Sequence, residues 1–178
     1  SKDADAGSVR QLMLQKKIEV VPVIDEHNVV VDVHRWTDAF AGEAMPKGPA
    51  LDIPVVVMAG GRSTRLEPLT KILPKPLIPL GEKPIIELIM DRFAEFGCRD
   101  FYLTLNYKGK MIQSYFDHAE CSYNVKFVWE DEFLGTAGSL RLAAPLIAAP
   151  HLFVSNCDIL ILADYGDICH FHRKTGHD

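Results

Sequence analysis

An apolar run that ends in two glycines constrains this chain more than any other feature. Residues 53–59 are short, apolar and rich in valine, as expected of a strand buried on both faces. Gly60 and Gly61 follow, and a glycine pair lets the backbone approach a ligand without intervening side chains. Backbone amides in such a turn can face phosphate oxygens. The pattern predicts a buried strand that leads into a phosphate-binding loop.

The loop after the glycines combines positive charge with a restricted backbone. Its prolines, which stiffen it, stand at positions 68, 74, 76 and 79. The cations that can contact phosphate groups are Arg62, Arg65, Lys71 and Lys75. Two common phosphate signatures, G-x-x-x-x-G-K-[ST] and G-x-G-x-x-G, are absent from the sequence. This argues against a P-loop NTPase and against a dinucleotide dehydrogenase.

Strands and helices alternate along the rest of the chain. The predicted strands span residues 100–106, 125–130 and 152–156, and the predicted helices span residues 84–97, 109–118, 137–147 and 165–174. Pro84 is expected at the first position of its helix, and Gly97 is expected to end it. This alternation predicts an α/β fold with a mostly parallel sheet and helices on both faces. Because ligands bind beyond the carboxyl ends of such strands, the polar residues that follow each strand should converge on one site.

Residues 1–41 read as a separate small α-β-β-α unit. The predicted elements are a helix at 9–17 with Leu12 and Met13 facing inward, strands at 19–25 and 28–33, and a second helix from Thr37. Residues 42–51 are rich in proline and glycine and are predicted to be a linker. Residues 52–178 are then the main domain.

Composition limits the possible partners and the location. Nineteen basic and twenty-four acidic residues leave a net charge of −5, which gives no general reason to bind nucleic acid. The four cysteines form no C-x-x-C pair, which is typical of reduced thiols in a cytoplasm. No segment approaches the roughly 20 apolar residues that span a bilayer. We therefore expect a cytoplasmic protein that binds neither nucleic acid nor membrane.

The run from Gly60 to Pro79 resembles the signature GGxGTRLxPLTxxxPKPLxP of the sugar-1-phosphate nucleotidylyltransferases. It differs at Ser63, where the signature has a third glycine, so the serine is expected to adopt a glycine-like backbone at some steric cost. The resemblance implies a Rossmann-like nucleotidyltransferase fold, of which residues 52–178 are the N-terminal half. It also implies the reaction, in which a sugar-1-phosphate oxygen attacks the α-phosphorus of a nucleoside triphosphate and pyrophosphate leaves.

The same resemblance implies roles for individual residues. Arg65, Lys75 and Asp158 would be catalytic, and Asp158 would also bind Mg²⁺, although Cys157 replaces the glycine that the family has before this aspartate. The nucleotide would be bound by Ala59, Gly60, Gly61, Thr64, Asn106, Glu130, Gly135 and Thr136. A turn aspartate and a strand-end asparagine that caps a turn are the simpler alternatives for Asp158 and Asn106.

The expectation about the base of the nucleotide rests on Glu130. A carboxylate only accepts hydrogen bonds, and guanine offers adjacent N1–H and N2–H donors, whereas thymine or uracil would be better met by an amide. GTP is therefore favoured, while thymidylyl, uridylyl, cytidylyl and adenylyl transfer stay open. Mannose-1-phosphate or an amino-hexose-1-phosphate would be the first sugar phosphates to try.

The N-terminal unit resembles the closing portion of a cystathionine-β-synthase-type (CBS) module, through the strand Val21-Pro-Val-Ile-Asp25. The family's small hydroxyl residue three positions before Asp38 is Arg35 here, which disfavours an adenosyl ligand. A packing appendage without a ligand is an equally good interpretation. An incomplete module would expose apolar surface and so favour a homo-oligomer or pairing with a missing half.

A second function stays open, a non-catalytic regulatory protein that senses nucleotides. Ser63 and Cys157, which replace two family glycines, support it. The presence of Arg65, Lys75 and Asp158 favours an enzyme, because a sensor needs no reactive-phosphate constellation.

Overall fold

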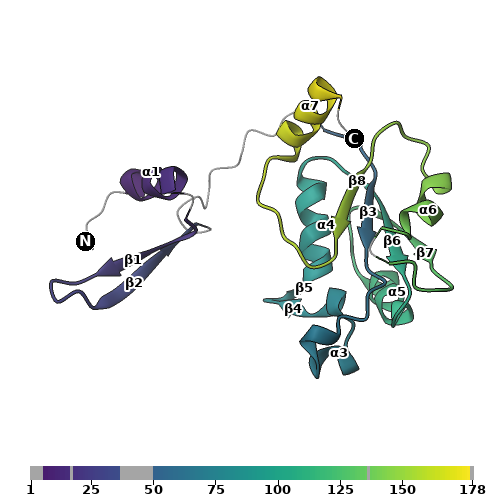
Figure 1. Ribbon diagram of the computed structural model, residues 1–178, viewed down its shortest axis with the longest axis horizontal. Helices are drawn as coiled ribbons and strands as arrows, with labels where there is room; N and C mark the ends of the chain where they lie inside the picture. The colour runs from purple at the N-terminus through teal and green to yellow at the C-terminus, as the bar shows by residue number, and fades with distance from the viewer. Residues whose placement is uncertain (1–5, 17, 37–49, 136, 177–178) are drawn as a thin grey trace. The chain divides into compact units, whose positions relative to one another are not determined.

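The computed structural model describes residues 6–16, 18–36, 50–135 and 137–176. The chain divides into two compact units between residues 46 and 47, and Figure 1 shows the elements of each. The linker at 42–51, the helix from Thr37 and Asp38 lie wholly or mostly outside the described residues. The domain boundaries at 41 and 52 stay predictions.

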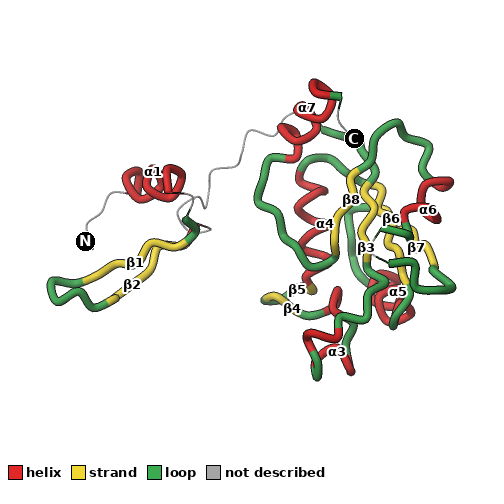
Figure 2. The backbone as a smooth tube through the Cα atoms, in the orientation of Figure 1, coloured by secondary structure: helices red, strands yellow, loops and turns green. Residues whose placement is uncertain are grey.

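The first unit is a helix with a β-hairpin. Helix α1 (Ala6–Lys16) precedes strands β1 (Val20–Ile24) and β2 (Val30–Arg35), which pair antiparallel. In the turn between the strands, Asp25 Oδ1 accepts hydrogen bonds from the backbone N–H groups of His27 (2.8 Å) and Val29 (2.9 Å). Figure 2 shows this hairpin as the two yellow strands of the unit. A short polar turn thus fixes the register of two valine-rich strands.

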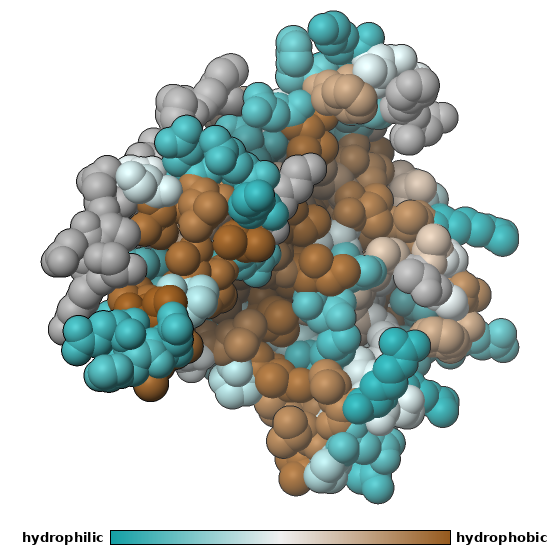
Figure 3. Space-filling view, turned by 60° about the vertical axis from the view of Figure 1, so that its left-hand side comes forward, coloured by the Kyte–Doolittle hydropathy of each residue, from teal (hydrophilic) through white to brown (hydrophobic). Residues whose placement is uncertain are grey.

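The small core of this unit corrects one prediction. Val9, Met13 and Val23 are buried, but Leu12 is 39% exposed, so the expectation that Leu12 faces inward is wrong. Val9 and Met13 are four positions apart, so they lie on one helix face, and these two side chains of α1 fill the small core. Val30 and Val31 of β2 are more than half exposed. Apolar side chains reach the molecular surface in several places (Figure 3).

The second unit is built on a four-stranded parallel sheet in the order β7-β6-β3-β8. Its strands are β3 (Val55–Met58), β6 (Asp100–Leu105), β7 (Asn124–Trp129) and β8 (Phe153–Asn156). A short hairpin, β4 (Pro79–Leu80) and β5 (Lys83–Pro84), stands apart from it. The predicted α/β fold with a parallel sheet is confirmed.

Helices cover both faces of this sheet. Helices α4 (Ile85–Glu95), α5 (Gly109–His118) and α7 (Tyr165–Thr175) pack on the face to which Val55 and Val57 point. Helix α6 (Leu140–Ala143) packs on the other face, against Val56. All three valines of β3 are fully buried, because successive strand residues point to opposite faces and both faces are covered.

Three local predictions need correction. Pro84 is the residue before α4 and not its first residue, although Gly97 ends the helix as expected, with φ 91°. The helix predicted at 137–147 is reduced to α6 and a 3₁₀ turn at Ala144–Leu146, because Pro145 has no N–H to continue the helical hydrogen bonds. The proline-rich loop is partly helical: its turns are η1 (Thr64–Leu66), α3 (Leu69–Ile72) and η2 (Lys75–Leu77).

Within the described residues, no helix is both long and apolar enough to cross a membrane.

Candidate nucleotide site

The strand register aligns four of the predicted residues in one row. Met58 pairs with Thr104 of β6 and with Asn156 of β8, and Leu105 pairs with Trp129 of β7. Continued past the strand ends, this register sets Glu130, Asn106, Gly60 and Asp158 side by side in the order of the strands. They stand at the carboxyl edge of the sheet, where open α/β sheets bind ligands.

The order in which the chain forms the strands also marks a position at this edge of the sheet. The chain passes from β3 to β6 and β7 on one side and then returns to β8 on the other side of β3. The strand order therefore reverses between β3 and β8, the kind of position at which open α/β sheets bind ligands. Gly60 and Asp158 flank that point.

Gly60 is enclosed by two other residues of the row. A Cβ atom on Gly60 would lie 2.8 Å from Glu130 Oε1 and 3.3 Å from Asn106 Cβ. Asn106 Nδ2 donates a 2.9 Å hydrogen bond to the Glu130 carbonyl, and the Tyr107 N–H donates one of 3.4 Å to the Gly60 carbonyl. The sequence prediction that these residues come together is confirmed by these contacts, and glycine is required here by close approach.

Glu130 belongs to this cluster and is only 7% exposed. Its Oε2 atom accepts a long hydrogen bond of 3.4 Å from the Leu134 N–H, while Oε1 is the atom nearest to Gly60. A carboxylate has about four lone-pair sites, so acceptor capacity is left for a further donor. In the following loop Gly135 has φ 82°, a conformation that favours glycine. Thr136 lies outside the described residues.

Ser63 has the left-handed conformation expected from its replacement of a glycine, with φ 53° and ψ 43°. Its carbonyl accepts a 3.1 Å hydrogen bond from Thr70 Oγ1, and Thr70 is 2% exposed. A buried threonine thus fixes the turn from within the loop. This contact offsets part of the cost of about 1–2 kcal/mol that a left-handed residue with a Cβ atom carries.

Lys75 and Asp158 form an ion pair that joins the loop to the end of β8, through Lys75 Nζ and Asp158 Oδ2. Their side chains are 27% and 30% exposed, respectively. The sequence separates these residues by 83 positions, and the fold brings them together. The pair places a cation and a carboxylate just after β8, at the carboxyl edge of the sheet.

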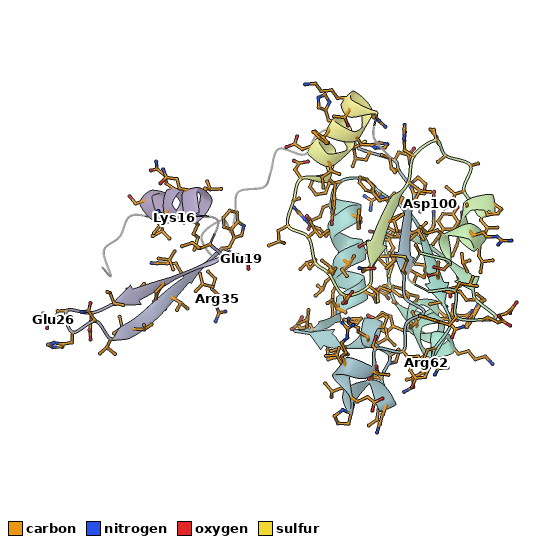
Figure 4. All side chains as sticks on the ribbon, viewed as in Figure 1. Lys16, Glu19, Glu26, Arg35, Arg62 and Asp100 are labelled. Carbon is orange, nitrogen blue, oxygen red and sulfur yellow. The ribbon has the colours of Figure 1, made fainter. Side chains whose placement is uncertain are left out.

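The other predicted residues of the loop face solvent. Gly61, Thr64 and Arg65 are exposed, and nothing lies within 4 Å of a Cβ placed on Gly61. Arg62 lies toward the carboxyl end of the sheet, whereas Asp100, the first residue of β6, lies at the opposite end (Figure 4). The backbone and cations of this loop are therefore accessible to a polyanion. Ala59, in contrast, is buried, and its N–H bonds to the Thr104 carbonyl (3.0 Å).

Cys157 stands between the strand and Asp158. Burial raises the pKa of its thiol to about 11, and the neighbouring Asp158 carboxylate adds to the rise, while Lys75 opposes it. The thiol therefore stays protonated at neutral pH and is not an activated nucleophile. The residue fills space where the family has glycine.

Sequence reasoning missed two residues of the loop framework. They are Thr70, which bonds to Ser63, and Lys108, whose Nζ donates hydrogen bonds to the carbonyls of Thr70 (3.1 Å) and Lys71 (2.6 Å). One signal was present in the sequence. Pro74 is the residue whose N–H would have bonded to the Thr70 carbonyl in a longer helix, so that carbonyl needed another donor.

Comparison with known proteins agrees with this geometry. Residues 54–178 match the family described as Nucleotidyl transferase. The mannose-1-phosphate guanyltransferase of Schizosaccharomyces pombe is 38% identical over 125 residues, which are 68% of this chain and 34% of that protein. The enzyme of the same name from Aspergillus oryzae is 37% identical over 127 residues, 69% of this chain and 35% of that protein. The chain thus spans about a third of the length of these relatives.

Solved structures have the same fold. HddC from Yersinia pseudotuberculosis, complexed with GMP-PN, is 30% identical with a TM-score of 0.61, over 67% of this chain and 54% of that one. A putative glucose-1-phosphate thymidylyltransferase from Bacillus anthracis is 20% identical with a TM-score of 0.62, over 68% of this chain and 50% of that one. The second likeness supports the fold alone. The CBS-like interpretation of the N-terminal unit finds no support in these matches and stays a prediction.

Proposed function

Because this chain belongs to the Nucleotidyl transferase family, we propose that the protein transfers GMP from GTP to a sugar-1-phosphate and releases pyrophosphate. The observation that carries the proposal is the row Glu130, Asn106, Gly60 and Asp158 at the carboxyl edge of the sheet, with Lys75 paired to Asp158. In our proposal, Glu130 accepts hydrogen bonds from the base, Gly60 lets the phosphates approach the backbone, Lys75 provides positive charge and Asp158 binds the metal.

The reaction needs position and charge more than acid–base chemistry. An oxygen of the sugar phosphate forms a bond to the α-phosphorus of GTP, the bond from that phosphorus to the β-phosphate oxygen breaks, and pyrophosphate carries away the electron pair. Catalysis of this kind comes from holding the reactants in line and from neutralising charge. In our proposal the amides of Gly60 and Gly61, together with Thr64, Arg65 and the buried Ala59 that follows β3, hold the triphosphate.

Lys75 is proposed to bind the α-phosphate and the sugar phosphate. Its ammonium group is neutralised by Asp158 in the structure, and both side chains are partly exposed, so the pair can open at a small cost. When phosphates provide competing negative charge, Lys75 can turn to them while Asp158 remains at the end of β8. The lysine thus has a partner that keeps it in place before substrate arrives.

Mg²⁺ is the proposed cofactor, and the residues present are compatible with it. Among the described residues no group of three or more His, Cys, Asp and Glu side chains could hold a metal by itself. Mg²⁺ commonly binds through one or two carboxylates together with substrate phosphates and water, which matches a single carboxylate at Asp158. Bound there, it would neutralise charge on the phosphate oxygens.

GTP is proposed as the nucleotide because Glu130 presents a buried carboxylate beside the glycine turn. Guanine can donate N1–H and N2–H to such a group. The names of the relatives, mannose-1-phosphate guanyltransferases, and the GMP-PN bound to HddC support the same base. Mannose-1-phosphate is accordingly the first sugar phosphate to test. A cytoplasmic location and a homo-oligomer remain predictions.

The test is pyrophosphate release by the whole protein with Mg²⁺. GTP, ATP, UTP, CTP and dTTP are compared in turn with mannose-1-phosphate, glucose-1-phosphate and an amino-hexose-1-phosphate. We expect release only when a triphosphate and a sugar phosphate are both present, and fastest with GTP. Use of dTTP at least as well as GTP would overturn the role of Glu130. GTP binding without release would favour the nucleotide-sensing alternative.

A further inference from the structure

Lys108 occupies a position that connects the phosphate loop to the sheet. It follows Asn106 and Tyr107, the turn at the exit of β6, and directly precedes α5. Its backbone is left-handed, with φ 54°, and its ammonium lies 5.3 Å from the centre of the Tyr107 ring. A long side chain is thus directed from the row of site residues toward the loop.

The ammonium group supplies hydrogen bonds that the loop cannot make for itself. Helix α3 is a single turn, and Pro74 and Pro76 follow it closely. Because Pro74 has no N–H, it cannot continue the helical bonding to the Thr70 carbonyl. Lys108 Nζ instead donates to the carbonyls of Thr70 (3.1 Å) and Lys71 (2.6 Å). A charged donor therefore caps the end of α3 from another part of the chain.

The contact continues to the glycine turn. Thr70, whose carbonyl Lys108 binds, donates through its own hydroxyl to the carbonyl of the left-handed Ser63. The turn that carries Lys108 also touches Gly60 through the Tyr107 N–H and Glu130 through Asn106 Nδ2. The short segment 106–108 therefore contacts the start of the loop, the middle of the loop and the residue after β7. These contacts fix the positions of the three parts relative to one another.

We propose that Lys108 is a positioning residue that holds residues 63–73 in the conformation that receives the triphosphate. It acts through backbone carbonyls and not on the phosphates. The inference rests on the proposed function only for the identity of the ligand. The tether itself is a property of the fold that can be measured without nucleotide.

The test uses Lys108→Met, which keeps the length of the side chain and removes the donor. Lys110→Met is the matched control, because Lys110 is an exposed lysine in the first turn of α5. Lys108→Arg retains a charged donor and serves as the rescue variant. Each variant is examined in the whole protein by hydrogen–deuterium exchange without ligand, by thermal unfolding and by calorimetric titration with GTP and Mg²⁺.

We expect Lys108→Met to speed exchange at the amides of Leu66, Lys71 and Leu73, which bond within the loop. The amides of β3 and β6 should stay protected. GTP affinity should fall about tenfold, the order expected for loss of a charged hydrogen bond. Lys110→Met should match the wild-type protein, and Lys108→Arg should recover most of the affinity.

Two results would overturn the inference. Exchange in residues 63–73 equal to that of Lys110→Met would show that Lys108 does not hold the loop. Faster exchange with unchanged GTP affinity would show that the tether has no part in binding. If the wild-type protein binds no GTP, the proposed function is wrong, and the exchange result then decides for or against the tether by itself.

Discussion

Gly60 and Gly61 are neighbours in the sequence, but their surroundings differ. Gly60 is buried against Glu130 and Asn106, whereas space around Gly61 is open. The first glycine is therefore needed for packing, and the second leaves room for a ligand. A side chain at Gly60 should therefore affect the stability of the site, whereas a side chain at Gly61 should affect only phosphate binding.

Alanine at each position tests this distinction. Gly60→Ala should lower the free energy of unfolding by about 1–3 kcal/mol, because its Cβ would lie 2.8 Å from a carboxylate oxygen that is itself buried. Gly61→Ala should leave stability unchanged and weaken GTP binding, because its methyl group would stand where phosphate oxygens approach the backbone. Urea unfolding and GTP titration of both variants provide the measurements. Equal loss of stability in the two would contradict the assignment.

Substitution of Lys75 should lower turnover far more than stability. Lys75→Ala removes an ion pair between partly exposed side chains, which contributes only about 0–1 kcal/mol. If Lys75 neutralises charge in the transition state, turnover should fall by roughly 10²–10³. Lys110→Ala is the control, since Lys110 is an exposed lysine in the first turn of α5 to which no phosphate contact is assigned. A melting temperature that falls in proportion to turnover would assign Lys75 a structural role.

At the scale of elements, α4 and α5 are joined by a polar network. Lys83 Nζ lies 2.6 Å from Glu87 Oε1 and 2.7 Å from Asp91 Oδ2. Tyr115 donates to Glu87, and Tyr123 donates to Asp91 (3.1 Å). Glu87 is buried, and these partners offset the cost of burying its carboxylate. The network fixes how the two helices pack beneath the sheet.

The network predicts a loss of stability at alkaline pH. Burial raises the pKa of Tyr115 from 10.0 to about 12, and its hydrogen bond to Glu87 adds to the rise. A raised pKa favours the protonated phenol in the folded state, so its contribution is complete below pH 10 and is lost as pH rises from 10 to 12. The difference in unfolding free energy between wild type and Tyr115→Phe should therefore shrink over this range. Parallel stability curves for the two proteins would contradict this.

The elements that the sequence predicted best are those with strong periodicity. Residues 109–118 form a helix with the predicted bounds, and the apolar face of α4 packs on the sheet as predicted. The helix predicted at 137–147 is shorter in the structure, because its apolar spacing was given more weight than Pro145 near its end. The sequence did not predict the helical turns of the loop or the hydrogen bonds of Lys108, and the reason is different. They depend on contacts between distant parts of the chain: Pro74 indicates that the Thr70 carbonyl needs another donor, but no pattern identifies Lys108 as that donor.

At the scale of the whole molecule, strand order explains why scattered residues form one site. The row from Glu130 to Asp158 exists because four parallel strands end at one edge in a fixed register. The sequence predicted the convergence but not the order, since alternating strands and helices are compatible with several arrangements. The order β7-β6-β3-β8 puts the strand that precedes Gly60 between the strands that precede Glu130 and Asp158.

The first unit should be dispensable for the folding of the sheet domain and for nucleotide binding. All the predicted site residues that the structure describes, and both clusters of the core around the sheet, lie in the second unit. The family match begins at residue 54. Removal of residues 1–46 from the whole protein should therefore leave both the unfolding transition of the sheet domain and GTP affinity unchanged.

The same truncation separates the two interpretations of the N-terminal unit. Its exposed valines on β2 predict self-association or pairing with another segment, so its removal should shift any oligomer toward the monomer without loss of GTP binding. Sedimentation velocity and GTP titration measure these two effects on the same sample. If GTP affinity falls while the sheet domain still unfolds at its usual temperature, the unit acts on the nucleotide site. That result would support regulation of the site by the first unit rather than an appendage that serves only packing.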